Sequence, residues 1–207
     1  IIMGKKIVIT GGLGYIGTEL CKIYSGVSWN NEILVIDNRF ISERVNQLRN
    51  WDINFVHGDV LDKNLVNKYC KDSDIVHHLA GITDVPRLKS DSSDDKDGKI
   101  KLVAEEGTQN ILDAISDNCK IIFPSTHVVY EGIEKVKKDI LEDEDVKPIL
   151  SYANSKAINE KQIKNSGKNY IILRLGSVYG YSTDTARIDI MPNLFSKIAS
   201  QDGTLKL

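Results

Sequence analysis

The chain has 207 residues, which is enough for one domain with a sizeable core, or for one domain and the start of another. Apolar residues make up 41% and charged residues 27%, as in ordinary globular proteins, and the net charge of -2 gives no general attraction for nucleic acid or anionic lipid. No apolar run approaches the roughly 18 residues of a membrane span. Composition therefore predicts neither a nucleic-acid partner nor a membrane partner.

The three cysteines, Cys21, Cys70 and Cys119, are far apart and form no Cys-x-x-Cys pair. No His/Cys group has the spacing of metal ligands, so no metal is predicted. The first apolar run begins at residue 6, too soon for a signal peptide. These features together predict a cytoplasmic protein.

Short apolar runs alternate with longer amphipathic stretches along the chain. The runs lack clean polar alternation, which is typical of strands buried on both faces of a parallel sheet. Their alternation with helical stretches predicts an α/β fold, a Rossmann-like doubly wound parallel sheet. The predicted strands are residues 6–10, 33–36, 53–56, 74–80, 120–123 and 170–173, and the predicted helices are residues 15–24, 42–49, 63–70, 99–116 and 152–165.

Two regions depart from this alternation. Residues 89–98 are rich in acids and turn formers and predict a surface loop. After residue 180 the chain offers a polar loop, a short helical stretch at residues 193–200, and the opening of a strand at residues 204–207.

A cluster of glycines follows the first predicted strand. Gly12, Gly14 and Gly17 satisfy the dinucleotide fingerprint G-x-G-x-x-G, and Gly11, Gly14 and Gly17 satisfy a variant with wider spacing. Glycine is needed because the turn is tight and its backbone must approach a pyrophosphate closely. The next helix would offer free N–H groups and the positive end of its dipole to the phosphates. The pattern predicts a dinucleotide cofactor.

An acidic residue, Asp37, lies twenty residues past Gly17 at the end of the second predicted strand. There its carboxylate would accept hydrogen bonds from the adenosine ribose and repel a 2′-phosphate, which favours NAD over NADP. Arg39 leaves an alternative open, because it could turn toward such a phosphate or be a solvated loop residue. We predict NAD as the cofactor, with NADP less favoured.

Tyr152 and Lys156 are four residues apart in a polar helical stretch. One helical turn places them on the same face, where the ammonium would lower the pKa of the phenol from about 10 toward neutrality. The resulting phenolate could accept a proton from a substrate hydroxyl. The order of glycine-rich turn and Tyr/Lys pair predicts a nicotinamide-dependent enzyme.

Taken in order, the motifs resemble those of the extended short-chain dehydrogenase/reductases, specifically the nucleotide-sugar epimerase and dehydratase family. The resemblance runs nearly the whole length and implies an NAD-dependent enzyme with a nucleotide-sugar substrate. The motifs are Gly11-Gly-Leu-Gly-Tyr-Ile-Gly17, Asp37-Asn38, Gly58-Asp-Val-Leu-Asp62, His78-Leu-Ala-Gly81, Gly107-Thr-Gln-Asn-Ile-Leu112, Ser125-Thr-His-Val-Val-Tyr130, Tyr152-x-x-x-Lys156 and Arg174-Leu-Gly-Ser-Val-Tyr-Gly180.

The resemblance also implies roles for individual residues. It implies catalytic roles for Thr126, Tyr152 and Lys156, with Ser125 as the neighbouring alternative to Thr126, and substrate contacts at Thr83, Thr126 and Ser177. Asp59 could instead cap the next helix, and Leu79 with Ala80 could be plain core. The implied cofactor-binding residues are Gly11, Gly14, Tyr15, Ile16, Gly17, Asp37, Asn38, Asp59, Val60, Leu79, Ala80, Gly81, Tyr152 and Lys156.

Three departures from the family pattern bear on the reaction. Dehydratases follow the catalytic threonine with Asp-Glu, whereas this chain has His127 and Val128, so dehydration is not expected. Ala104 and Ser177 stand where relatives often carry asparagine. We predict epimerisation through transient oxidation of a sugar hydroxyl. The alternatives are an NAD(P)-dependent reductase or dehydrogenase of a sugar or other small carbonyl compound, and a non-catalytic dinucleotide sensor.

Residues 1–180 are predicted to form an NAD-binding Rossmann domain, and residues 181–207 the beginning of an incomplete substrate-binding lobe. A homodimer is a further expectation. His57, His77 and His78 are predicted to be packing residues with satisfied ring nitrogens, whereas His127 borders the expected site.

Overall fold

The computed structural model describes residues 4–27, 30–83, 94–182, 188 and 190–205. Its centre is a six-stranded, fully parallel sheet in the order β3-β2-β1-β4-β5-β6. The order reverses between β1 and β4, which opens a crevice at the carboxyl ends of those strands. The predicted Rossmann-like fold is confirmed. The strands are β1 Lys6–Thr10, β2 Glu32–Asp37, β3 Asn54–His57, β4 Ile75–His78, β5 Lys120–Thr126 and β6 Asn169–Leu175.

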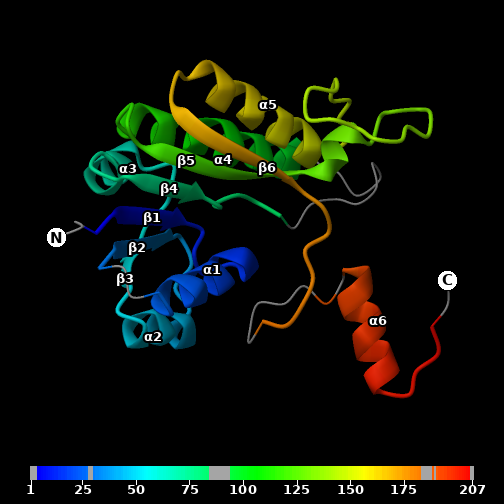
Figure 1. Ribbon diagram of the computed structural model, residues 1–207, viewed down its shortest axis with the longest axis horizontal. Helices are drawn as coiled ribbons and strands as arrows, with labels where there is room; N and C mark the ends of the chain where they lie inside the picture. The colour runs from blue at the N-terminus through cyan, green and yellow to red at the C-terminus, as the bar shows by residue number, and fades with distance from the viewer. Residues whose placement is uncertain (1–3, 28–29, 84–93, 183–187, 189, 206–207) are drawn as a thin grey trace.

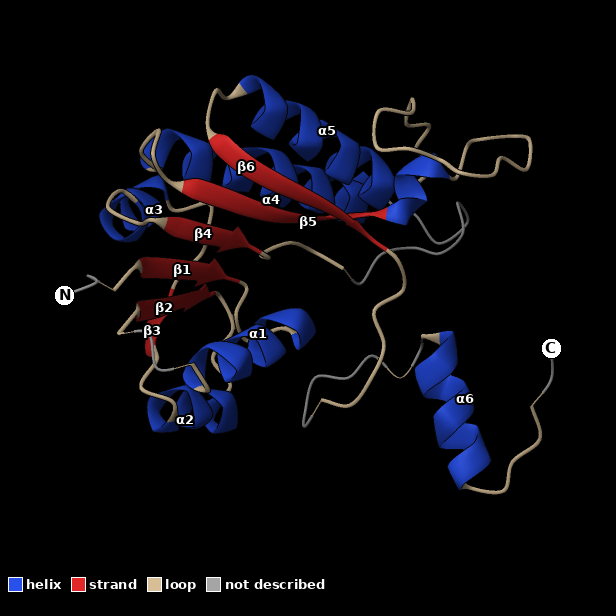
Figure 2. Ribbon diagram, viewed as in Figure 1, coloured by secondary structure: helices blue, strands red, loops and turns tan. Residues whose placement is uncertain are grey.

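Helices cover both faces of the sheet (Figure 1). Two of them, α1 and α2, pack on one face, and α3, α4 and α5 pack on the other. Figure 2 shows α6 standing apart from these layers, and none of its residues is buried. The helices are α1 Tyr15–Ser25, α2 Ser42–Asn50, α3 Lys63–Cys70, α4 Asp94–Ala114, α5 Ser151–Asn165 and α6 Met191–Ser200, with a 3₁₀ helix, η2, at His127–Tyr130.

Two hydrophobic cores account for the apolar runs in the sequence. Val8 of β1 packs into the core under α3, α4 and α5, whereas its neighbours Ile7 and Ile9 pack into the core over α1 and α2. Successive residues of a strand point to opposite faces, so a strand covered on both sides needs apolar residues at consecutive positions. All three of these side chains are almost fully buried.

Several predicted boundaries were wrong. Helix α4 begins at Asp94, so the predicted loop fails over residues 94–98, while residues 89–93 lie outside the described part. Acidic residues favour a helix N-terminus through the helix dipole as readily as they favour turns. Strand β4 ends at His78, and β5 continues to Thr126 because Ser125 and Thr126 still pair with β6.

The predicted strand at the carboxyl end is not seen in the part that is described. Residues 204–205 form no strand, and residues 206–207 lie outside the described ranges. Among the described helices, none combines the length and apolar character that a bilayer span requires. The described residues also contain no group of three or more His, Cys, Asp or Glu side chains suited to a metal ion.

Two adjacent histidines of β4 are buried on opposite faces of the sheet. The His77 Nε2 atom lies 2.7 Å from the Tyr24 hydroxyl, and the His78 Nδ1 atom lies 2.8 Å from Thr10 Oγ1. The other His78 nitrogen lies 3.1 Å from Thr108 Oγ1. The prediction that both rings are satisfied packing residues is confirmed. For His57 it is wrong in part, because that residue is exposed, although its Nε2 atom lies 2.9 Å from the Asn38 carbonyl. Burial lowers the pKa of His77 to about 4, and burial with the charge of Lys156 lowers the pKa of His78 to about 3.

These depressed pKa values predict that acid destabilises the fold. An unfolded histidine binds a proton near pH 6.5, but the folded chain resists it until about pH 4, so the stabilisation present above pH 6.5 is lost as pH falls through that window. Each histidine should contribute a slope of up to about 1.4 kcal/mol per pH unit. Urea unfolding at pH 7 and pH 5 measures the change in the free energy of unfolding. His77→Gln should flatten the dependence, and an unchanged slope would contradict the assignment.

Candidate cofactor and catalytic site

The glycine-rich turn joins β1 to α1 at the strand-order reversal. Gly11 has φ +70°, and a Cβ added there would lie 2.8 Å from the Ala80 nitrogen, so only glycine fits without strain. A Cβ at Gly17 would lie 2.6 Å from the Gly12 Cα, which fixes the close approach of α1 to the turn. Gly14 is the N-cap of α1 and offers no side-chain acceptor to its first N–H groups. These donors fit a pyrophosphate.

Asp37 ends β2 beside this turn and is 5% exposed. Its carboxylate accepts hydrogen bonds from the Leu13 and Arg39 backbone N–H groups, both at 3.0 Å. The Arg39 guanidinium also contacts it, with Nε 3.3 Å from Oδ1. Arg39 therefore pairs with Asp37 in this structure. The predicted acidic group does lie beside the glycine-rich turn.

Asn38 follows β2, and Asp59 and Val60 follow β3, at the same edge of the sheet. The Asn38 side-chain amide donates to Asp59 Oδ2 at 2.9 Å, and Leu61 N–H donates to the other Asp59 oxygen at 3.0 Å. The N-cap of α3 is Asp62, which accepts from two backbone N–H groups, so the alternative reading of Asp59 as the helix cap is wrong. Val60 is buried.

The segment after β4 passes directly over the glycine-rich turn. Leu79 N–H donates to the Thr10 carbonyl at 3.1 Å, and Ala80 N–H donates to Thr10 Oγ1 at 3.2 Å. Leu79 also packs, partly buried, against the core over α1 and α2, so the alternative prediction that it is a core residue is confirmed in part. Gly81 is exposed, and a Cβ added there would meet nothing within 4 Å. Thr83 is exposed as well.

Tyr152 and Lys156 lie in the first half of α5, as the spacing predicted. The Lys156 Nζ atom donates to the Pro124 carbonyl at 2.8 Å and lies 4.4 Å from the centre of the Phe123 ring. It is 5.8 Å from the centre of the Tyr152 ring. Burial lowers the pKa of Lys156 to about 8. The ammonium thus lies near the tyrosine ring and at the carboxyl end of β5.

Ser125 and Thr126 end β5 and were the two candidates for the hydroxyl that contacts substrate. Adjacent strand residues face opposite sides of a sheet. The Ser125 hydroxyl donates to the buried Glu160 carboxylate at 2.6 Å. Thr126 Oγ1 instead accepts from the Val128 N–H at 3.3 Å, at the start of η2. Because the Ser125 hydroxyl already donates to Glu160, Thr126 remains the candidate for the hydroxyl that contacts the substrate.

The remaining predicted residues lie at the surface near this edge. Ile16 and Ser177 are exposed, and the Tyr15 hydroxyl donates to the Gly180 carbonyl at 2.8 Å. This contact ties the first residue of α1 to the segment after β6. His127 is exposed, and its Nδ1 atom lies 3.2 Å from the Leu175 carbonyl.

Two residues near the site were not predicted from the sequence. Arg44 of α2 donates from Nη1 to the Leu13 carbonyl and so braces the glycine-rich turn. Nothing distinguishes it from the other basic residues on helix surfaces. Glu160 lies four residues past Lys156, the same spacing as that between Tyr152 and Lys156. This spacing could have indicated that all three residues share one face of the helix.

Comparison with known proteins places the chain in a family. The sequence profile of the NAD dependent epimerase/dehydratase family matches residues 7–207. CDP-paratose 2-epimerase of Salmonella typhi is 34% identical over 144 residues, which are 64% of this chain and 40% of that protein. The dTDP-D-glucose 4,6-dehydratase of Dictyostelium discoideum is 29% identical over 197 residues, covering 85% of this chain and 44% of that protein.

A solved structure extends the likeness to three dimensions. UDP-glucuronic acid 4-epimerase of Bacillus cereus, in complex with UDP-glucuronic acid and NAD, matches with a TM-score of 0.75 and 26% identity, over 97% of this chain and 64% of that one. The chain therefore spans about two fifths to two thirds of the length of these relatives.

The chain belongs to the NAD dependent epimerase/dehydratase family. This confirms the predicted resemblance to the extended short-chain dehydrogenase/reductases, the prediction of an enzyme, and NAD as the cofactor of the family.

Asp37→Ala and Asp37→Ser test cofactor choice. If Asp37 is the ribose acceptor expected from the sequence, both changes remove that acceptor and the charge that repels a 2′-phosphate, so NAD should bind more weakly and the difference in affinity between NAD and NADP should narrow. Titration of each variant with both cofactors measures this. Unchanged discrimination would mean that Asp37 does not face the ribose.

Proposed function

We propose that this protein is an NAD-dependent nucleotide-sugar epimerase that acts by transient oxidation of a sugar hydroxyl. The observation that carries the proposal is the Tyr152/Lys156 pair. Lys156 donates to the carboxyl end of β5 and lies 5.8 Å from the centre of the Tyr152 ring, on the same edge of the sheet as the glycine-rich turn. Thr126 is followed by His127 and Val128, so no carboxylic acid stands there to drive loss of water. Epimerases are among the relatives.

Most cofactor residues in this proposal lie at the ends of β1 to β4, and Tyr152 and Lys156 of α5 complete the set. The backbone at Gly11, Gly14, Tyr15, Ile16 and Gly17 would hold the pyrophosphate. Asp37 and Asn38 would bind the adenosine ribose, Asp59 and Val60 would border the adenine, and Leu79, Ala80 and Gly81 would line the path to the nicotinamide ribose. When bound, NAD supplies the carbon that accepts and returns a hydride.

The proton chemistry belongs to the chain itself. Tyr152, as a phenolate, accepts the proton of the sugar hydroxyl and later gives it back. Lys156 stabilises that phenolate through its charge and also binds the cofactor ribose. Thr126 donates a hydrogen bond to the reacting hydroxyl and orients it. Thr83 and Ser177, at the exposed rim, would contact the substrate.

The proposal extends to the organisation of the whole protein. Residues 1–180 would form the NAD-binding domain and residues 181–207 the start of the lobe that closes over the nucleotide sugar. We also propose a homodimer in the cytoplasm. The three cysteines are free and buried, which supports a reducing compartment.

Cofactor accounting distinguishes this proposal from its alternatives. An epimerase regenerates NAD in each turnover and so interconverts two sugars without net NADH. A reductase or dehydrogenase would consume or release one NADH or NADPH per product, and a sensor would bind the cofactor and turn over nothing. Product analysis with UDP-, CDP- and dTDP-sugars, together with absorbance at the NADH band, decides among them.

Tyr152→Phe removes the acid/base and leaves the ring. Turnover should fall by about two to four orders of magnitude, while the fold and NAD affinity stay close to those of the unchanged protein. Steady-state kinetics, with NAD titration as the control, measure both. Near-normal turnover would remove this tyrosine from the mechanism.

Lys156→Met removes the ammonium that serves both ribose and phenol. NAD affinity and turnover should both drop, and the residual turnover should rise with pH toward about 10, where a tyrosine ionises unaided. A pH-rate profile of the variant checks this. A residual activity that is flat from pH 7 to 10 would show that Lys156 does not tune the phenol.

A further inference from the structure

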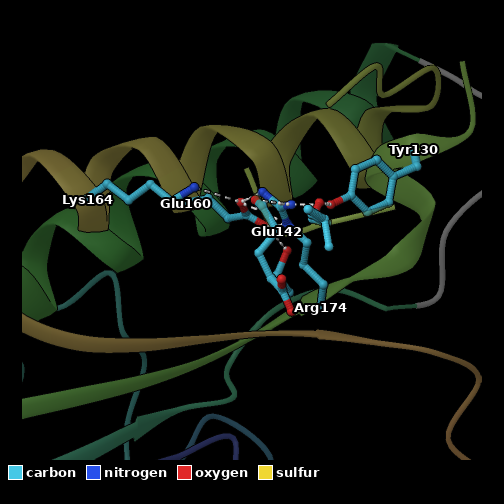
Figure 3. Close-up of polar contacts among 7 residues, drawn as sticks. Tyr130, Glu142, Glu160, Lys164 and Arg174 are labelled. Carbon is cyan, nitrogen blue, oxygen red and sulfur yellow. Dashed lines mark hydrogen bonds and ion pairs between the residues drawn. The ribbon is translucent and has the colours of Figure 1, made fainter. Parts of the chain in front are cut away.

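Glu160 is a buried carboxylate on which three elements of the fold converge (Figure 3). It lies on α5, accepts from the Ser125 hydroxyl of β5 at 2.6 Å, and receives a two-point contact from Arg174 of β6. Arg174 donates from Nη2 to Oε2 at 2.6 Å and from Nε to Oε1 at 2.9 Å. Lys164, at 3.5 Å and 45% exposed, is a weaker surface partner.

The position of these contacts relates them to the proposed catalytic groups. Ser125 is the residue before Thr126, and Glu160 lies two helical turns past Tyr152 on α5. Arg174 pairs in register with Ser125 across β5 and β6. The carboxylate therefore joins the strand that carries the threonine to the helix that carries the tyrosine.

Arg174 extends the same connection to the segment that leads into α5. Its Nη1 atom donates to the Tyr130 hydroxyl and, at 3.0 Å, to the Glu142 carbonyl. The Tyr130 hydroxyl in turn donates to the Leu141 carbonyl at 3.1 Å. One guanidinium thus uses all three of its nitrogens and connects Glu160 with Tyr130 and Glu142, which are labelled in Figure 3.

Glu160 and Arg174 each favour the charged form of the other. Burial alone would raise the pKa of Glu160, but the hydrogen bonds from Arg174 and Ser125 and the charges of Arg174 and Lys164 outweigh it and lower that pKa. Glu160 raises the pKa of Arg174 further above its usual value. A two-point Arg–carboxylate contact fixes orientation as well as distance, which a single lysine cannot do.

We propose that Glu160 and Arg174 are positioning residues that set the placement of Tyr152 relative to Thr126, through Ser125 on one side and the segment 130–142 on the other. The inference rests on the proposed function, since the distance matters only if those two groups act together on one sugar hydroxyl. An error of about 1 Å in such a placement costs about 100-fold in rate.

Glu160→Gln in the full chain is the primary test. Turnover per NAD-loaded site should fall about 10- to 100-fold, NAD affinity should change less than about twofold, and deuterium exchange of residues 141–150 should accelerate. Tyr130→Phe is a milder second variant, because it removes only the hydroxyl arm and should give a smaller change of the same kind. Lys164→Gln, which alters the exposed partner of the same carboxylate, is the matched control and should change none of the three readouts.

The outcomes separate the inference from the proposed function. A Glu160→Gln protein that melts at a lower temperature but keeps full turnover per NAD-loaded site would show a merely structural contact and overturn the inference. If the unchanged protein converts no nucleotide sugar, the proposed function fails. In that case the inference fails with it. If the function holds, unchanged exchange of residues 141–150 in Glu160→Gln would overturn the part of the inference that runs through that segment.

Discussion

The close packing of the Gly11 turn against the end of β4 is the constraint on which the site depends. β1 pairs with β2 on one side and β4 on the other, so the chain must turn sharply where the strand order reverses. With less than 3 Å between the Ala80 nitrogen and the place of a Cβ at Gly11, the two backbones meet without side chains between them. The turn and the start of α1 therefore lie at the carboxyl ends of the strands, where the crevice opens.

A second constraint acts at the other half of the sheet. Lys156 reaches the Pro124 carbonyl, while Glu160 reaches Ser125, so two successive turns of α5 are tied to two successive residues of β5. Polar contacts of this kind fix the helix along its axis, which apolar packing alone does less well because it tolerates sliding. In the proposed function, one wall of the crevice between the two halves binds the phosphates and the other carries the proton-transfer groups. This division suits an enzyme that leaves redox chemistry to its cofactor.

Local signals predicted most of this arrangement. The glycine spacing, the acid at the end of β2 and the Tyr152/Lys156 pair are each set by neighbouring residues, so their chemistry is readable from the sequence. The Arg174 contact with Glu160 was not predicted, because its partners come from β6 and α5 and only the folded sheet brings them together. Asp94 to Asp97 were misread because the same residue types favour turns and helix starts. The choice between Ser125 and Thr126 likewise could not be made from the sequence, because it depends on which group each hydroxyl contacts in the folded protein.

The most direct test of the central claim follows the hydrogen on the reacting sugar carbon. The protein is loaded with NAD and incubated with a nucleotide sugar that carries deuterium at that carbon, and the product is examined by mass spectrometry and NMR. Epimerisation by transient oxidation predicts an epimer that retains the deuterium at the same carbon, with no NADH released into solution. A keto product accompanied by one deuterated NADH per turnover would contradict it and identify a dehydrogenase.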